Sequence, residues 1–155
     1  MFCVSSFGNG TLTKAFLARV FEECATYDGE MDYNGFLDFV LAMENMHEPQ
    51  ALGYLFRVLD VGGQGRLTGH TIKYFYNAIE SRLQSQDANP PPFSDIHNEI
   101  FDMVHPKNPD YITLDDLLRS GKGETVVNIL TDVQGFLVHE NREMLITGLI
   151  DEAEL

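Results

Sequence analysis

The sequence is poor in positive charge: 10 Lys and Arg residues stand against 24 Asp and Glu residues in 155, a net charge of −14. Proteins that bind nucleic acid use Lys and Arg to neutralise phosphates, so this balance excludes a nucleic-acid partner. Anionic membrane surfaces attract basic segments by the same electrostatics, and we expect no membrane partner either. The excess of negative charge would attract cations or basic protein surfaces.

Cysteine and long apolar runs are also scarce. The two cysteines, Cys3 and Cys24, are too few for a disulfide framework and lack metal-knuckle spacing, which is typical of reduced intracellular thiols. No apolar run approaches the roughly 20 residues that span a bilayer, and no basic residue precedes the short apolar stretch at the N-terminus. We therefore expect no membrane span, no signal peptide, and a location in the cytoplasm or the nucleus.

Catalytic motifs are missing as well. The segment around Lys122 resembles a phosphate-binding loop, but Asp116 replaces its first glycine and Gly123 follows the lysine where Ser or Thr is required. The five histidines have no HExxH or other paired spacing, and acidic neighbours oppose thiolate formation at Cys24. The sequence thus predicts no enzymatic activity and no catalytic residue.

Apolar residues recur at helical spacing along most of the chain. In the first such segment Leu12, Phe16 and Val20 repeat every four residues. Residues 84–92 are polar and end in three consecutive prolines, which no helix can cross. Strand signals are nearly absent, so the sequence predicts an all-α chain of one domain or two small lobes.

Two turns have the spacing of an EF-hand, a helix–loop–helix unit that often binds Ca²⁺. Its twelve-residue loop needs Gly at the sixth position for a sharp turn, and an apolar residue two positions later pairs with the neighbouring loop. The matching pairs lie 36 residues apart and are Gly29 with Met31 and Gly65 with Leu67. They define loops over 24–35 and 60–71.

Two weaker repeats follow. A third unit places Asp110 at the turn and Ile112 at the pairing position, and a fourth would use Gly135 and Leu137. The expected fold is therefore all-α, built from paired EF-hand-like helix–loop–helix units with short β pairing between loops. Its expected parts are a leading segment (1–10), an EF-hand-like pair (11–83), a Pro-rich linker (84–93), a second helical, EF-hand-like lobe packed on the first (94–150) and an acidic tail (151–155).

The 60–71 loop is the best candidate for Ca²⁺, but its ligand set is incomplete. Ca²⁺ takes six to eight oxygens, drawn mainly from alternate loop positions and a bidentate Glu at the twelfth. Asp60 supplies the first position and Gln64 could supply the fifth, whereas Gly62 offers no side chain at the third. Thr71 replaces the Glu, and Arg66 places a positive charge beside the ligands. We expect no cofactor here beyond Ca²⁺ at low affinity.

The other loops are weaker candidates. The 24–35 loop has the carboxylates Asp28, Glu30 and Asp32, but Cys24 and Gly35 stand at its first and twelfth positions. In the third loop, the positions that need carboxylates hold His105, Lys107 and Pro109. The sequence therefore predicts loops that keep EF-hand geometry and have lost most of their ligands.

A long acidic stretch has two interpretations. Between Arg19 and Arg57 there is no Lys or Arg, while eight Asp and Glu residues accumulate. The stretch could be a solvated helical surface or a docking face for a basic partner. The two differ in salt dependence, because association with a docking face slows as ionic strength rises.

The order of motifs resembles the B″ regulatory subunits of protein phosphatase 2A (PP2A). The stretches that carry the resemblance are FLDFVLAMEN (36–45), EPQAL (48–52), FRVLD (56–60), YFY (74–76), EIFDMVHPK (99–107), ITLDDL (112–117) and ENRE (140–143). They cover nearly the whole chain in the family's order and spacing. The chain is most similar to the branch that includes the plant TONNEAU/FASS proteins and their animal counterpart linked to centrosomes and the cytoskeleton.

The resemblance implies a non-catalytic subunit that joins the PP2A scaffold and catalytic subunits and selects substrates or a location, with cytoskeletal proteins as further partners. It also implies that the chain is the C-terminal part of a longer protein. Some family members bind Ca²⁺ through the loop that matches 60–71, where this sequence departs at Gly62, Gln64 and Thr71. The alternative function is a Ca²⁺-responsive EF-hand sensor or adaptor, in which metal binding opens a helix pair.

Overall fold

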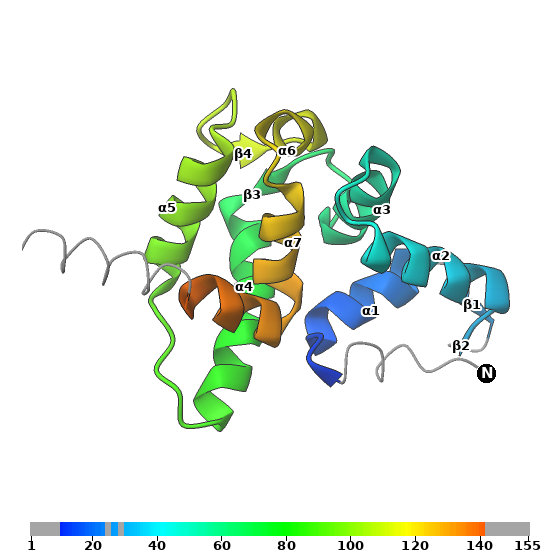
Figure 1. Ribbon diagram of the computed structural model, residues 1–155, viewed down its shortest axis with the longest axis horizontal. Coiled ribbons are helices and arrows are strands. Elements are labelled where there is room, and N and C mark those ends of the chain that lie inside the picture. Colours follow the sequence, from blue (N-terminus) through cyan, green and yellow to red (C-terminus); the bar gives the residue numbers. More distant parts are fainter. Residues whose placement is uncertain (1–9, 24–25, 28–29, 142–155) are drawn as a thin grey trace, which may run out of the picture.

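The computed structural model describes residues 10–23, 26–27 and 30–141, and most of them are helical (Figure 1). The helices are α1 (Lys14–Glu23), α2 (Tyr33–Glu44), α3 (Pro49–Leu59), α4 (Gly69–Ser85), α5 (Phe93–Val104), α6 (Leu114–Ser120) and α7 (Gly123–Thr131), with a further helix over 133–141. Four strands of two residues each complete the described part: β1 (Thr26–Tyr27), β2 (Glu30–Met31), β3 (Leu67–Thr68) and β4 (Tyr111–Ile112). The predicted all-α class with short β pairing is confirmed.

The helices begin where the sequence supplies suitable caps. Pro49 occupies the first turn of α3, where its missing N–H costs nothing. The side chain of Thr68 accepts from the N–H of Thr71 and starts α4, while Thr113 accepts from the N–H of Asp116 and starts α6. Local hydrogen bonds thus fix the points at which the two EF-hand-like loops pass into their exiting helices.

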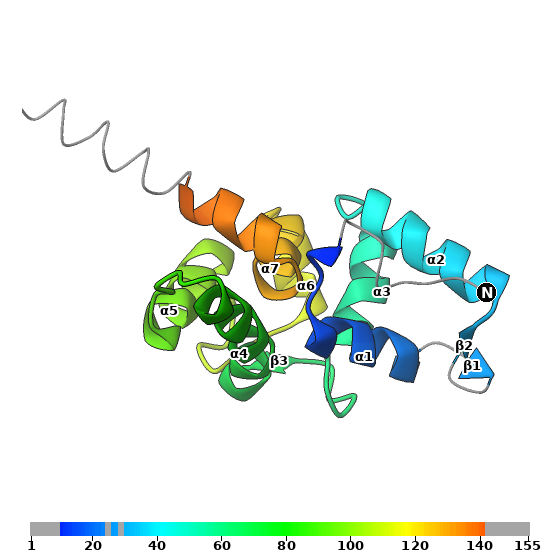
Figure 2. The same cartoon turned by 90° about the horizontal axis from the view of Figure 1, so that it is seen from below.

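Two groups of helices lie side by side (Figures 1 and 2). In one group α3 packs against α1 and α2, and in the other α4 packs between α5 and α7. Contacts of α1 with α4, and of α3 with α6 and α7, join the groups. A single apolar core runs through both, with fully buried side chains from most of the helices, including Phe16, Phe39, Leu55, Phe75, Tyr76, Ile79 and Ile100.

The segment before α1 closes the molecule by pairing with the end of α7. The N–H of Thr13 donates to the carbonyl of Thr131 at 3.0 Å, and the N–H of Val133 donates to that of Thr11 at 3.0 Å. Thr13 also caps α1, because its hydroxyl accepts from the N–H of Phe16. These bonds join residues about 120 positions apart and hold the two helical groups together.

The connection between α4 and α5 is tied to the core. The hydroxyl of the buried Tyr76 donates to the carbonyl of Pro91, and the Tyr76 ring packs against those of Phe93 and Phe136. Burial raises the pKa of Tyr76, with smaller contributions from nearby carboxylates, so its hydroxyl stays protonated as a donor.

Among the described residues, no helix is both long enough and apolar enough to cross a bilayer.

The strand pairing differs from the expected pairing within residues 11–83. The 60–71 loop pairs with the 105–116 loop, through Leu67 opposite Ile112 and Thr68 opposite Tyr111. In the 24–35 loop, Met31 pairs instead with Thr26 of the same hairpin. Leu67 and Ile112 are both fully buried, so the pairing that forms is the one that brings two apolar side chains into the core.

Candidate functional site

The 60–71 loop connects α3 to α4. Backbone N–H groups of the loop donate to the carboxylate of Asp60, the residue at the first loop position. One Asp60 oxygen accepts from the N–H of Gln64 at 3.0 Å and the other from the N–H of Gly65 at 2.6 Å. Gly65 has φ +74°, the left-handed conformation predicted for the sixth position. Asp60 is buried, so its carboxylate holds the turn from inside.

The remaining candidate ligands of this loop have other structural roles. The hydroxyls of Thr68 and Thr71 lie 3.2 Å apart, and each accepts from the other residue's backbone N–H in a capping box. Arg66 is exposed and places its guanidinium 5.2 Å from the centre of the Tyr111 ring. Gly62 has φ +89° and adopts a backbone conformation that favours glycine in the turn. The structure therefore brings one carboxylate, that of Asp60, to this loop.

The 105–116 loop has a buried carboxylate at its twelfth position, where a calcium loop has its bidentate Glu. Asp116 is 1% exposed and accepts from the backbone N–H groups of Thr113 at 2.9 Å and Lys107 at 3.3 Å. The guanidinium of Arg119 donates to it at 3.0 Å. Counting twelve positions from His105 would have found Asp116 in the sequence, whereas its partners depend on the fold.

The charge on Asp116 is stabilised by the protein itself. Burial by itself raises the pKa of this carboxyl. Hydrogen bonds from Thr113, Lys107 and Arg119 together lower the pKa by more than burial raises it, so the pKa lies below its usual value. The carboxylate is therefore ionised at neutral pH. A guanidinium and two backbone amides surround it, at a position that faces the cation in a calcium-binding loop.

The 24–35 loop lies partly outside the described residues. Cys24, Asp28 and Gly29 fall there, and the side chain of Glu30 is also not described. Asp32 caps α2, because its carboxylate accepts from the N–H of Gly35 at 2.7 Å. The carboxylate predicted as a weak calcium ligand thus has a helix-capping role in the structure.

Arg19 links α1 to the entrance of the 60–71 loop, a role that sequence reasoning missed. Its guanidinium donates to the carbonyl of Val58 at 2.9 Å and to that of Asp60 at 3.2 Å. Ion pairs with Glu22 at 2.6 Å and Glu23 at 3.0 Å balance its charge. Because the last carbonyls of a helix lack intrahelical partners, this buried side chain completes the C-terminus of α3.

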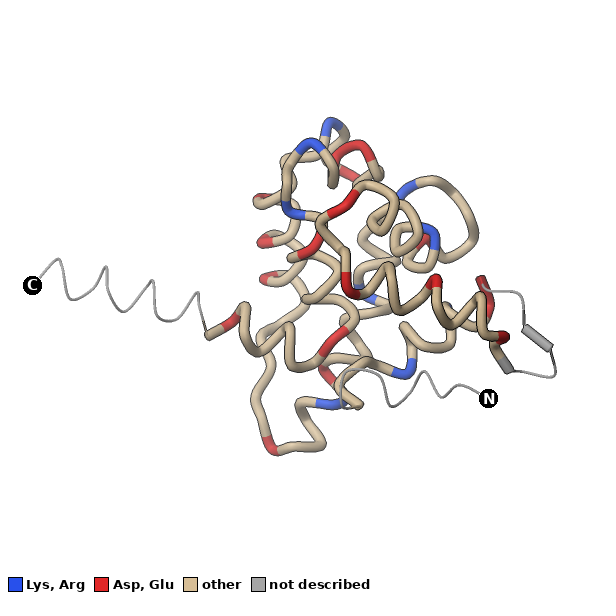
Figure 3. The backbone as a smooth tube through the Cα atoms, turned by 45° about the vertical axis from the view of Figure 1, so that its right-hand side comes forward, with Lys and Arg blue, Asp and Glu red and all other residues tan. Residues whose placement is uncertain are grey.

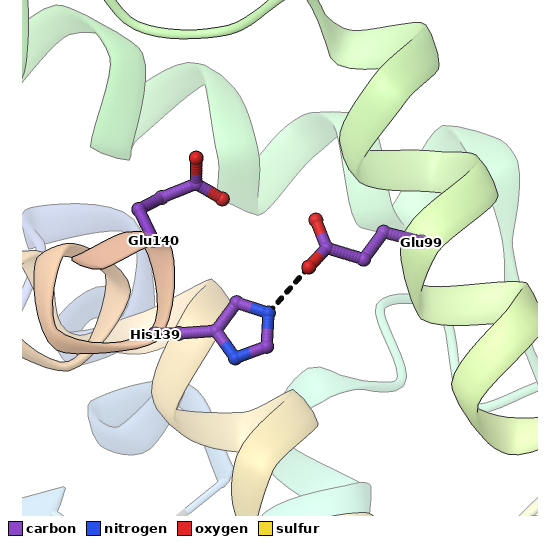
Figure 4. Close-up of side chains that lie close together, drawn as sticks. All are labelled: Glu99, His139 and Glu140. Atoms are coloured by element: carbon purple, nitrogen blue, oxygen red, sulfur yellow. Dashed lines mark hydrogen bonds and ion pairs between the residues drawn. The ribbon is translucent and has the colours of Figure 1, made fainter. Parts of the chain in front are cut away.

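A second group of ionisable side chains lies between α5 and the 133–141 helix (Figure 4). Glu99 comes from α5, and Nε2 of His139 lies 2.5 Å from its Oε1. The carboxylate of Glu140 is close by, and the nearest ligand atoms of the three residues all lie within 4.8 Å of one another. In the described part of the chain this is the group whose donor atoms come close enough to hold a metal ion.

The geometry contains no arrangement for nucleophilic or acid–base catalysis in the described residues. His139 pairs with the carboxylate of Glu99, and the Asp116 carboxylate pairs with the guanidinium of Arg119. The 60–71 and 105–116 loops instead have a structural role. The buried Leu67–Ile112 pair and the hydrogen bonds within each loop hold the adjoining ends of four helices together.

Comparison with known proteins gives a consistent result. No protein-family model matches the chain. The chain is 50% identical, over 96% of its length, to the B″ gamma regulatory subunit of serine/threonine-protein phosphatase 2A from Danio rerio. The Homo sapiens B″ gamma protein is 50% identical over 94% of the chain, and an Arabidopsis thaliana protein described as the probable B″ regulatory protein TON2 is 41% identical over 92%.

A solved structure supports the same relationship. A chain in a structure described as the PP2A PR70 holoenzyme superposes on this one with a TM-score of 0.81 and 28% identity, over 87% of this chain and 51% of that one. The chain is similar to part of the B″ regulatory subunits of PP2A. It spans about a third of the length of the curated B″ relatives, 32% of the Danio rerio protein and 31% of the Arabidopsis protein.

These similarities confirm the resemblance to B″ subunits predicted from the sequence. The similarity to B″ gamma and to TON2, at 50% and 41%, exceeds the 31% identity to an Arabidopsis B″ epsilon protein, in agreement with the TONNEAU/FASS-like branch. The name of the PR70 structure indicates calcium in that protein. In this chain, the carboxylates of Asp60 and Asp116 accept hydrogen bonds from their own loops.

Proposed function

We propose that the protein containing this chain is a non-catalytic regulatory subunit of a PP2A holoenzyme. It binds the scaffold and catalytic subunits and directs the phosphatase to substrates or to a place in the cell. The observation that carries this proposal is 50% identity to a B″ gamma protein across 96% of the chain. Superposition on a chain of a PP2A PR70 holoenzyme supports it. Hydrolysis is left to the catalytic subunit.

Affinity purification of the full-length protein tests this proposal. The tagged protein is captured from cells at physiological salt, and the bound proteins are identified by mass spectrometry. The scaffold and catalytic subunits of PP2A should both be recovered, together with phosphatase activity that the purified B″ protein lacks by itself. Recovery of neither subunit would overturn the proposal.

The acidic α1–α2 stretch is a candidate for the docking contact. Carboxylate positions are spread along most helices of the described chain (Figure 3), and Asp38, Glu44 and Glu48 are all exposed around α2. If this stretch docks on a basic surface of the holoenzyme, replacing these three residues by their amides should slow association and reduce its salt dependence. An unchanged association rate at low salt would identify the stretch as a solvated surface.

We propose that the 60–71 loop binds Ca²⁺ weakly or not at all. Asp60 is the single carboxylate at that loop, and its two oxygens accept backbone hydrogen bonds. Sensor EF-hands bind Ca²⁺ with Kd of roughly 10⁻⁷–10⁻⁵ M through several carboxylates. Calorimetric titration with Ca²⁺ should therefore show no binding in that range. Saturable binding at micromolar Ca²⁺ would instead support the Ca²⁺-responsive sensor.

We also propose that the protein acts in the cytoplasm or nucleus, with cytoskeletal proteins at the centrosome as further partners. The similarity to TON2 and B″ gamma supports this branch of the family. Imaging of the full-length protein tagged at its own locus tests it, with a centrosomal marker for comparison. Uniform exclusion from centrosomes and cytoskeleton would overturn the cytoskeletal link.

A further inference from the structure

The contact between α5 and the 133–141 helix joins three side chains that carry metal-binding atoms. Glu99 and His139 are 40 residues apart in the chain, and the fold places their Oε1 and Nε2 atoms 2.5 Å apart. Glu140 contributes a second carboxylate, so that one donor atom from each residue falls within 4.8 Å of the others. Figure 4 shows the three side chains converging on the space between the two helices.

From this geometry we propose that Glu99, His139 and Glu140 bind a Zn²⁺ ion. The donor set is one imidazole nitrogen and two carboxylate oxygens, which suits Zn²⁺, whereas Ca²⁺ and Mg²⁺ prefer sites made of oxygen alone. Three protein ligands leave a fourth position for water or for a group from another molecule. The site is separate from the 24–35, 60–71 and 105–116 loops, and the proposal does not rest on the proposed function. The fourth unit expected at Gly135 and Leu137 is instead part of the 133–141 helix.

The distances are compatible with an ion entering the existing contact. Ligands bound about 2.0–2.2 Å from Zn²⁺ in a tetrahedral site lie roughly 3.3–3.6 Å apart. The His139–Glu99 contact of 2.5 Å therefore has to open by about 1 Å, and the Glu140 carboxylate, within 4.8 Å of the other two ligand atoms, has to move inward by at most about 1.5 Å. Rotation of the Glu99 side chain, which is 28% exposed, and of the half-buried Glu140 can provide both changes, while His139, 13% exposed, stays in place.

The surroundings favour a cation. Asp95 and Asp102 of α5 line the same surface cavity as Glu99 and Glu140, and all of the charged residues that line it are acidic. These carboxylates lower the electrostatic potential around the three ligands and raise the local concentration of divalent ions. Asp95 and Asp102 attract the ion by charge, while the three ligands bind it directly.

Two helices that the core already holds in place carry the ligands. α5 and α7 both pack on α4, and the 133–141 helix follows α7 after one residue, with Phe136 in the core. The ligand backbones are therefore positioned before the ion arrives, which lowers the entropy lost on binding. A bound ion would fasten the 133–141 helix to α5.

Calorimetric titration with Zn²⁺ tests the site. The 155-residue chain, prepared without a polyhistidine tag and stripped with EDTA, is titrated with zinc chloride, and we expect saturable binding of one ion per chain. His139→Gln and Glu99→Gln should each weaken binding by at least about tenfold, since loss of even an outer-shell partner costs 10–100-fold. Glu140→Gln should act in the same direction.

Matched variants distinguish a ligand set from diffuse attraction. His70→Gln removes an exposed imidazole on α4 and should leave Zn²⁺ affinity unchanged. Asp95→Asn removes one charge from the acidic cavity and should weaken binding less than Glu99→Gln does. Circular dichroism of each variant verifies the fold. Cobalt substitution adds a second readout, because visible absorption should appear in the native chain and vanish in His139→Gln.

Three results would overturn the proposal. The first is an absence of saturable Zn²⁺ binding, which would leave Glu99 and His139 as an ion pair. The second is binding that His139→Gln does not weaken. The third is an equal loss of affinity in Asp95→Asn and Glu99→Gln, which would show that the acidic surface attracts the ion without these ligands.

Discussion

The guanidinium of Arg119 and the carboxylate of Asp116 form an ion pair in which Nη2 lies 3.0 Å from Oδ1. Asp116 is the twelfth residue of the 105–116 loop, the position at which an EF-hand binds its ion through a bidentate Glu. The positive charge beside this carboxylate comes from the chain itself, on the same side of α6. Backbone N–H groups of Lys107 and Thr113 supply the remaining hydrogen bonds. The loop is thus held in an EF-hand shape by protein groups.

Replacing Asp116 by Ala should destabilise the fold by about 2–3 kcal/mol, because the partly buried N–H groups of Lys107 and Thr113 lose their acceptor and α6 loses its capping box. Urea unfolding followed by circular dichroism measures the change. Asp115→Ala is the matched control: this carboxylate is exposed and pairs with Arg119 at 3.2 Å, so its loss should cost less than about 1 kcal/mol. Equal effects of the two variants would contradict the assigned role of Asp116.

The stability contributed by Asp116 should depend on pH. Its pKa is lower in the folded chain than the value of about 3.9 expected when unfolded. Such a carboxylate stabilises the fold fully above the unfolded pKa and loses this contribution as pH falls through the folded pKa. The stability difference between the native chain and Asp116→Asn should therefore shrink between about pH 5 and pH 2. A difference that stays constant in urea titrations across that range would show that Asp116 is not the titrating group.

Gly123→Ala should destabilise the packing of α7 against α3. A Cβ at Gly123 would lie 2.7 Å from both methyl carbons of the buried Leu52, so the Leu52 side chain would have to leave its packed position. Such overpacking costs about 1–3 kcal/mol. The control is Gly53→Ala within α3, where the nearest atom would be 3.9 Å away and Ala should stabilise the helix by up to about 1 kcal/mol. Thermal unfolding of both variants checks the opposite signs.

Arg19→Leu should destabilise the end of α3 by about 2 kcal/mol, since hydrogen bonds that involve a charged group contribute roughly 1.5–3 kcal/mol. The variant keeps an apolar stem on α1 but removes the donors to the carbonyls of Val58 and Asp60. Arg66→Ala, which removes an exposed guanidinium over Tyr111, should cost less than about 1 kcal/mol. Amide hydrogen exchange measured in the 60–71 loop would locate the effect. Unchanged protection of these amides in Arg19→Leu would argue against a stabilising role for the Arg19 hydrogen bonds.

The helices were predictable because their signals are local. The four-residue spacing of Phe16 and Val20 places them on one face of α1, and both are buried. Leu12 continues the spacing and is buried, but it lies before the helix, in a bridge to Asp132. Gly65 was predicted at the sharp turn of its loop and has φ +74°. Both depend on residues within a few positions of one another, so sequence pattern was sufficient.

The partner of the 60–71 loop was not predictable in the same way. Strands of two residues leave almost no periodic signal, and the Gly29 and Gly65 turns favoured a pairing of the first two loops. The structure pairs Leu67 with Ile112, which are 45 residues apart. Which loop becomes the neighbour depends on how α4, α5 and α6 pack, and that depends on the whole core.

The candidate sites also differ in whether local sequence or long-range packing determines them. Sequence spacing located Asp60, Gly62, Gln64, Arg66 and Thr71 in one loop, and the structure adds that Asp60 and Thr71 bond within it. Glu99 and His139 carry no shared motif, and nothing in the sequence indicated that they meet. Only the packing of the last described helix against α5 brings them together.

The low count of positive charges, the helical periodicity and the EF-hand-like turns were determined by the sequence alone, because composition and short-range spacing are sufficient for them. The family resemblance was equally a property of the sequence, since it rests on the order of short motifs. The tertiary structure decided which loops pair, that Arg119 neutralises Asp116, and that His139 reaches Glu99. These depend on contacts between separate elements, whose geometry is set by side-chain packing over the entire core.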